Sequence, residues 1–121
     1  MGKGERLRKG SQFTTVYSQG KTWATNLVLI KALPNGLDYN RYGFVAGKRL
    51  GKAVIRNRIK RLLREIVRAT PTKQGWDIIL IARINAANSN YQELNHAVEV
   101  LLKRAGIINH DDCRIECKVE G

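Results

Sequence analysis

Residues 48–68 read KRLGKAVIRNRIKRLLREIVR, which is both the longest predicted helix of the chain and its densest block of positive charge. Nine basic residues and one acid give this block a net charge of +8, out of +12 for the whole chain. A turn of about 100° per residue gathers its large apolar side chains on one arc, which predicts a buried stripe made of Ile55, Ile59, Leu62, Leu63 and Ile66. The opposite arc carries Asn57, Arg61, Arg64 and Arg68. The charge is therefore expected to form one face of the helix.

The composition of this face favours a nucleic-acid partner. Further basic residues flank it, namely Lys48, Arg49, Lys52, Arg56, Arg58 and Lys60. Like charges one turn apart repel each other, and Glu65 offsets little of that repulsion, so stability alone does not favour the arrangement. A solvated surface helix normally mixes charges of both signs. Arginine outnumbers lysine here, and its planar guanidinium binds phosphate through two parallel hydrogen bonds. We therefore predict a phosphate-binding helix whose affinity for nucleic acid falls steeply with salt.

The residues before the block predict a short helix and an antiparallel hairpin. Residues 1–10 contain four basic residues and three glycines and are expected to form a flexible basic lead-in. Residues 12–19 predict a helix with Phe13 and Tyr17 on one face, one turn apart. Two segments rich in strand-forming residues and separated by a turn then predict a hairpin over residues 22–46.

The residues after the block predict a strand at 76–83, a last helix that begins at Ser89, and an edge strand at 113–119. A strand, a long helix and a second strand in succession form a βαβ unit, so the strands near Val45 and Ile79 are expected to run parallel. The whole chain, residues 1–121, is therefore predicted to be a single α+β domain built in two layers.

Several other classes of function are disfavoured by the sequence. No apolar run approaches the roughly 18 residues of a membrane span, and no signal peptide is recognisable, so a cytoplasmic protein is expected. A basic amphipathic helix on an anionic membrane stays open as an alternative, and it requires exposed apolar residues on the 48–68 helix. Glu93, His96 and Glu99 are interpreted as a solvated helix face rather than a metal site. No residue grouping suggests catalysis, so neither catalytic nor metal-binding residues are predicted.

Residues 56–65, RNRIKRLLRE, preceded by KRLGKAV at 48–54, resemble the RNR signature of the protein subunit of bacterial ribonuclease P. The similarity covers about residues 5–105. It implies a compact α/β sandwich with an about four-stranded mixed sheet and a left-handed βαβ crossover, an exception to the usual rule. It also implies a protein that is not itself the catalyst, because in that family an RNA subunit with Mg²⁺ cleaves precursor tRNA at the mature 5′ end.

The resemblance further implies which residues meet which partner. The RNR helix faces the catalytic RNA, here through Arg56, Asn57, Arg58, Lys60, Arg61 and Arg64. A cleft between the first helix and the sheet contacts the 5′ leader of precursor tRNA, and Phe13 and Tyr17 match its aromatic positions. These two rings are open to two interpretations, leader stacking and packing of the short helix onto the core. Ile84 departs from the pattern, since the family often has a basic residue there.

The resulting prediction is a tRNA-processing ribonucleoprotein subunit whose partners are the catalytic RNA and precursor tRNA. It is expected to bind no cofactor by itself, to use Mg²⁺ through the RNA, and to have neither a membrane partner nor a small-molecule substrate. The alternative is a ribosomal-type protein that braces folded RNA without a role in cleavage.

Overall fold

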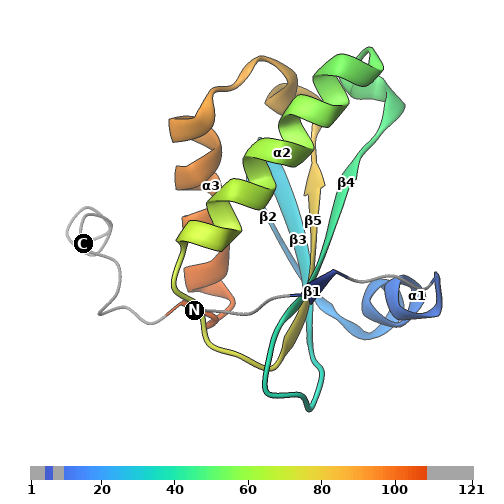
Figure 1. Ribbon diagram of the computed structural model, residues 1–121, viewed down its shortest axis with the longest axis vertical. Helices are drawn as coiled ribbons and strands as arrows, with labels where there is room; N and C mark the ends of the chain where they lie inside the picture. Colours follow the sequence, from blue (N-terminus) through green and yellow to red (C-terminus); the bar gives the residue numbers. More distant parts are fainter. Residues whose placement is uncertain (1–4, 7–9, 109–121) are drawn as a thin grey trace.

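The computed structural model describes residues 5–6 and 10–108, which form a mixed sheet covered by helices (Figure 1). Its elements in chain order are β1 (Glu5–Arg6), α1 (Gly10–Gln19), β2 (Lys21–Ala24), β3 (Val28–Pro34), β4 (Arg41–Ala46), η1 (Lys48–Leu50), α2 (Ala53–Ala69), β5 (Trp76–Ala82), η2 (Ile84–Asn88) and α3 (Tyr91–Arg104), where η denotes a 3-10 helix. The predicted strand at 113–119 lies outside the described residues.

The sheet has the strand order β1-β4-β5-β3-β2, with four main strands and the two-residue β1 at one edge. Strands β2, β3 and β5 pair antiparallel, whereas β4 pairs parallel with β5 and also with β1. In the parallel pair, Val45 lies opposite Ile81 and Gly43 opposite Ile79. The predicted α+β fold with a mixed sheet is therefore confirmed, and so is the parallel βαβ unit. The left-handed sense of the crossover stays a prediction.

The predicted hairpin over residues 22–46 is wrong. Strand β5 lies between β3 and β4, so these two consecutive strands do not pair. The hairpin in this region joins β2 to β3 instead, and its turn is held by Thr25, whose Oγ1 accepts hydrogen bonds from the N–H groups of Leu27 and Val28 at 3.2 Å. Buried residues along β5 explain the arrangement, since a strand covered on both faces is stable in the interior of a sheet.

Helices α2 and α3 cover one face of the sheet, and α1 lies against part of the other (Figure 1). Because successive strand residues point to opposite faces, Ile78 and Leu80 of β5 join the core under α2 and α3, while Ile79 packs with Val16 of α1. The larger cluster also contains Ile59, Leu63 and Ile66 of α2. The helix that carries the charge is thus anchored by the main core.

Four expectations about where elements lie differ from the structure. The basic block is not one continuous helix, because Gly51 at a φ of 126° separates η1 from α2. The last helix is capped by Asn90 rather than Ser89, through a reciprocal capping box with Glu93. Glu5 and Arg6 of the expected flexible lead-in form β1, and Gly10 already begins α1, two residues before the predicted start.

Candidate nucleic-acid interface

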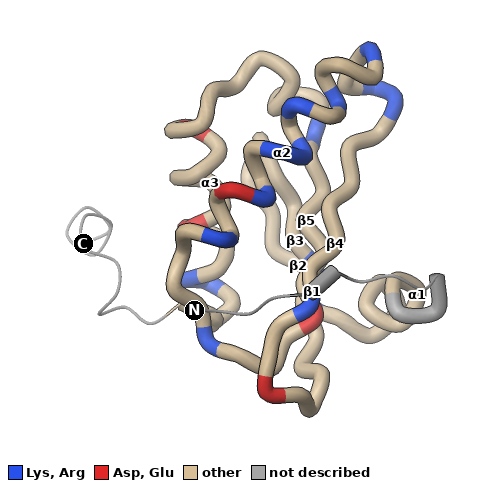
Figure 2. Tube along the Cα trace, in the orientation of Figure 1, with Lys and Arg blue, Asp and Glu red and all other residues tan. Residues whose placement is uncertain are grey.

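The exposed side of α2 carries the residues predicted to bind RNA. Asn57, Arg61 and Arg68 are exposed and Arg64 is half-buried, and these four residues are called the basic face. Figure 2 shows Lys and Arg positions following one another along this helix. The amphipathic spacing therefore places the charge on the outside as predicted.

The opposite side of α2 is the predicted apolar stripe. Ile59, Leu63 and Ile66 are buried, whereas Ile55 and Leu62 are half-buried against the same core. Val67, which was missed, is buried as well. An amphipathic membrane helix would need these stripe residues exposed, yet Ile59 and Ile66 are buried in the core, which removes that alternative; Val54, outside the stripe, is exposed. Within the part of the chain that the structure describes, no helix is long and apolar enough to span a membrane.

One flank of the basic face is a row of cations one turn apart, formed by Arg56, Lys60 and Arg64. All three side chains are half-buried. The Nε atoms of Arg56 and Arg64 are buried and have no hydrogen-bond partner among the described residues. A buried donor without an acceptor is unfavourable, so these guanidinium groups gain from any rearrangement that brings them an acceptor such as a phosphate oxygen.

On the other flank, Arg58 has a structural contact. Its guanidinium NH2 group donates a hydrogen bond of 3.1 Å to the backbone oxygen of Ser89, at the end of η2. This contact ties α2 to the segment that follows β5. Arg58 therefore differs from the basic face, because part of its hydrogen-bonding capacity is already used within the protein.

The start of α2 extends the positive surface. Lys48 and Arg49 are exposed on η1, which is held by the buried Leu50, and the exposed Lys52 is the N-cap of α2. The first turn of α2 contains no acidic residue. Because unpaired N–H groups and the positive end of the helix dipole also lie there, the N-terminus of α2 is a favourable position for a phosphate.

The aromatic residues of α1 lie against the other face of the sheet, away from α2 (Figure 1). Phe13 is half-buried and packs on the cluster of Val16 and Ile79, whereas Tyr17 is 40% exposed. The Lys31 ammonium group lies 5.8 Å from the centre of the Tyr17 ring and donates a 2.8 Å hydrogen bond to Thr22 Oγ1. Phe13 thus contributes to packing, while Tyr17 and Lys31 form a surface with an aromatic ring and a cation.

Lys31 was missed in the sequence, although its neighbours could have revealed it. Ile30 and Ala32 of β3 are buried under α2 and α3, so the residue between them must point to the opposite face. Because α1 covers only part of that face, Lys31 emerges beside it.

No metal site is found in the described part of the chain, where no three His, Cys, Asp or Glu residues are grouped to hold an ion. Of the three residues interpreted as a solvated face, Glu93 and His96 are exposed on α3, whereas Glu99 is half-buried. Cys113 and Cys117 lie outside the described residues.

Comparisons with known proteins point to one family. The family model described as Ribonuclease P matches residues 1–106. A ribonuclease P protein component of Dehalococcoides mccartyi (strain CBDB1) is 41% identical over 120 residues, covering 99% of this chain and 100% of the relative. Another from Alkaliphilus oremlandii is 44% identical over 106 residues, covering 86% and 93%.

Solved structures give the same result. The RNase P protein of Staphylococcus aureus, at 33% sequence identity, superposes with a TM-score of 0.79, covering 88% of this chain and 100% of the other. The RNase P protein of Thermotoga maritima, at 32% identity, superposes with a TM-score of 0.74, covering 83% and 96%.

Proposed function

Because the chain belongs to the ribonuclease P protein family, we propose that it binds both a catalytic RNA and the 5′ leader of precursor tRNA and thereby assists leader removal. It is a protein component of the endoribonuclease that matures tRNA 5′ ends, and RNA is its partner. The observation that carries the proposal is the one-sided distribution of charge on α2, whose basic face is exposed while the opposite stripe is buried. We also propose a cytoplasmic location, since these relatives are bacterial proteins.

The catalytic RNA is assigned to the α2 surface. Its residues are the basic face and its neighbours, namely Lys48, Arg49, Lys52, Arg56, Asn57, Arg58, Lys60, Arg61, Arg64 and Arg68. Each phosphate that such a cation neutralises releases condensed counterions, which supplies favourable free energy at low salt. The half-buried row at Arg56, Lys60 and Arg64 supports the assignment, because two of its guanidinium groups contain a buried donor without an acceptor.

The leader is assigned to the surface at α1. Tyr17 offers an exposed ring on which a base can stack, and stacking on an aromatic side chain is worth about 1–3 kcal/mol per base without demanding a particular sequence. The nearby Lys31 cation suits the phosphate of the same nucleotide. Phe13 helps to hold α1 on the sheet beneath this surface, since it is half-buried and packs on the cluster of Val16 and Ile79. Because α1 and α2 lie on opposite faces of the sheet, the two RNAs meet different sides of the protein.

Hydrolysis is assigned to the RNA subunit and to Mg²⁺ that the RNA holds. Mg²⁺ prefers oxygen ligands such as carboxylates, phosphates and water, whereas every residue of the proposed interface except Asn57 carries a guanidinium or ammonium group that repels a cation. The protein contributes positive charge and positioning. By neutralising phosphates, it lowers the Mg²⁺ concentration that the RNA needs to fold and to bind its substrate.

A cleavage assay at low Mg²⁺ tests the proposal. Catalytic RNA alone is expected to cleave precursor tRNA poorly under these conditions, and adding the chain is expected to restore cleavage at the mature 5′ end. A protein that only braces RNA binds the catalytic RNA without restoring cleavage, and this result would overturn the proposal. The double variant Arg61→Ala/Arg64→Ala serves as the interface control, because its restored activity should require more protein.

A further inference from the structure

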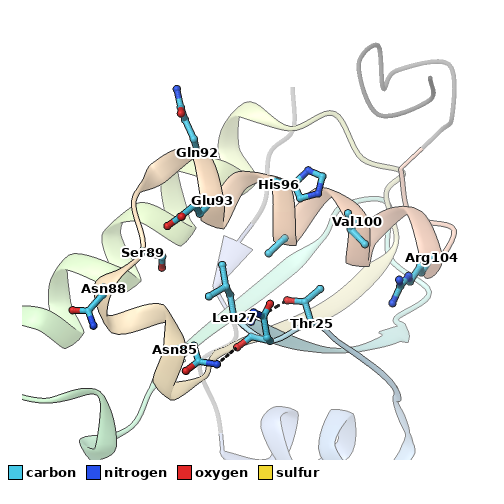
Figure 3. Close-up of a pocket in the computed structure, with 12 residues that line it drawn as sticks. Thr25, Leu27, Asn85, Asn88, Ser89, Gln92, Glu93, His96, Val100 and Arg104 are labelled. Carbon is cyan, nitrogen blue, oxygen red and sulfur yellow. Dashed lines mark hydrogen bonds between the residues drawn. The ribbon is translucent and has the colours of Figure 1, made fainter. Parts of the chain in front are cut away.

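An open pocket of about 800 Å³ lies between α3, the β2–β3 turn and η2 (Figure 3). No residue of α1 or α2 lines it, but it adjoins the α2 surface, because Arg58 donates a hydrogen bond to the backbone oxygen of Ser89, one of the lining residues. Its volume falls in the range of about 300–1,000 Å³ that is typical of sites for small organic ligands.

The pocket has an apolar floor. Leu27 of the β2–β3 turn is half-buried and lines the pocket together with Ala97 and Val100, which lie one turn apart on α3. Leu27 also packs against the main core, which fixes one wall of the pocket. A flat, weakly hydrated group placed on these side chains would bury apolar area on both partners, which is favourable.

The lining is rich in carboxamides, namely Asn26, Asn85, Asn88 and Gln92. The Gln92 amide points away from Leu27 (Figure 3), so it must turn to meet a ligand placed there. The Asn85 side-chain NH2 donates a 3.3 Å hydrogen bond to the backbone oxygen of Asn26, which joins η2 to the β2–β3 turn and stabilises the shape of the rim. Asn88 and Gln92 are exposed. Each carboxamide presents a donor and an acceptor side by side, which is the pattern needed to pair with the edge of a nucleobase.

The charge of the lining differs from that of α2. Arg104 is its one strong cation and Glu93 its one acid, and Glu93 Oε1 already accepts the backbone N–H of Asn90 in the capping box. The lining therefore has no formal net charge with His96 neutral. A pocket of this kind does not select a phosphate chain. It selects an uncharged, planar group with hydrogen-bonding edges.

We propose that this pocket binds a purine base, adenine by preference, that is unstacked from a single-stranded segment of RNA. Asn and Gln side chains pair with the N6 and N7 positions of adenine through two hydrogen bonds, and unpaired RNA bases are commonly read on such edges. The RNA origin of the base rests on the proposed function, because the RNA that docks on α2 supplies the strand. Free adenosine contains the same chemistry and is the second possible source.

Amide NMR spectra of the full chain test the proposal with three probes: adenosine, uridine, and a short single-stranded RNA containing one adenine among uridines. Adenosine and the RNA are expected to shift the signals of Ala97, Val100 and Asn88, and uridine is expected to bind more weakly. The double variant Asn88→Ala/Gln92→Ala should weaken adenosine binding roughly tenfold, in line with the loss of a bidentate contact. Gln74→Ala, an exposed carboxamide away from the pocket, is the matched control and should bind like the wild type.

Two results would overturn the proposal. If millimolar adenosine shifts no pocket signal, the site does not take a base. If adenosine binds but the RNA leaves the pocket unchanged, the pocket is a site for a free nucleoside and the RNA origin is wrong. A further variant, Val100→Trp, fills the pocket and should abolish adenosine binding; unchanged binding would also contradict the assignment. None of these measurements depends on cleavage. A failure to restore precursor cleavage would therefore contradict the proposed function but would not change the outcome of the adenosine-binding test.

Discussion

The ammonium group of Lys31 lies 5.8 Å from the centre of the Tyr17 ring, which fixes a cation beside an aromatic surface on the α1 side of the sheet. For Tyr17→Ala, affinity for precursor tRNA is expected to fall by about 1–3 kcal/mol through the loss of base stacking, while affinity for mature tRNA stays unchanged. Binding titrations with both RNAs measure this difference. An equal loss for the two would assign Tyr17 to packing.

Replacing Lys31 by Met should act differently, because it removes a charge while keeping an aliphatic side chain. The logarithmic salt dependence of precursor binding should flatten by about 0.7, the value for one phosphate contact on a single strand. Titrations at several salt concentrations give the slope. Asp38→Asn, which removes a negative charge from an exposed loop, is the control. An unchanged slope for Lys31→Met would contradict the proposed phosphate contact.

Phe13 combines packing with a position beside the proposed leader surface, so two variants separate its roles. Phe13→Ala removes packing against Val16 and Ile79 and should lower both the free energy of unfolding and precursor binding. Phe13→Leu keeps most of the apolar volume and should preserve stability while still weakening precursor binding. Urea unfolding and binding titrations check the two effects. If Phe13→Leu binds like the wild type, the ring serves the core alone.

On the basic face, Arg61→Ala/Arg64→Ala should weaken binding of the catalytic RNA and reduce its salt slope by about 1.8, which corresponds to two phosphates. The fold should persist, because Arg61 is exposed and Arg64 half-buried outside the core. The double variant Lys21→Ala/Lys73→Ala removes the same charge from exposed positions elsewhere and is the control. Identical salt slopes for the two double variants would show that RNA binding depends on the total charge of the protein and not on the position of the basic face.

Arg58 is expected to contribute to stability as well as to RNA binding. Arg58→Ala removes the hydrogen bond to the Ser89 oxygen and should cost about 1 kcal/mol of unfolding free energy. Arg68→Ala, on the basic face, should leave stability nearly unchanged. Thermal or urea unfolding of both variants without RNA tests the distinction, and equal stability would contradict a structural role for Arg58.

Asp77 closes the end of the sheet, where its carboxylate accepts two hydrogen bonds from Arg41 at 2.8 and 2.7 Å and one from Asn35 at 2.9 Å. Asp77→Ala removes a buried partner from Arg41 and should destabilise the protein by about 3 kcal/mol. Urea unfolding measures the loss, with the exposed Asp38→Ala as control. If Asp77→Ala lowers the free energy of unfolding no more than Asp38→Ala does, the ion pair does not stabilise the protein.

The helix that carries the charge could be predicted from the sequence because its pattern is local. Apolar and basic residues repeat with the helical period, so the exposed Arg61 and the buried Ile59 follow from spacing alone. Strand order is not local in this way. The pairing of β3 with β5 joins residues about 50 positions apart, such as Ile30 and Leu80, and alternation within a strand does not identify its neighbour.

The proposed leader surface could be predicted only in part. Phe13 and Tyr17 are visible as an aromatic pair, but Lys31 joins them only after α1 folds back over β3. The pocket between α3 and the β2–β3 turn has no sequence signature, since its carboxamides come from three separate segments. Such constellations depend on tertiary packing, which local periodicity does not encode.

The interior position of β5 has a consequence for synthesis on the ribosome. Strands β3 and β4 emerge early, yet the strand that joins them follows α2 in the chain. Until about residue 82 has left the exit tunnel, α2 has no completed sheet on which to bury Ile59, Leu63 and Ile66. A nascent chain that ends before β5 therefore exposes its cationic helix together with an uncovered apolar stripe. Burial of the apolar stripe of α2 therefore depends on a strand that is synthesised after the helix itself.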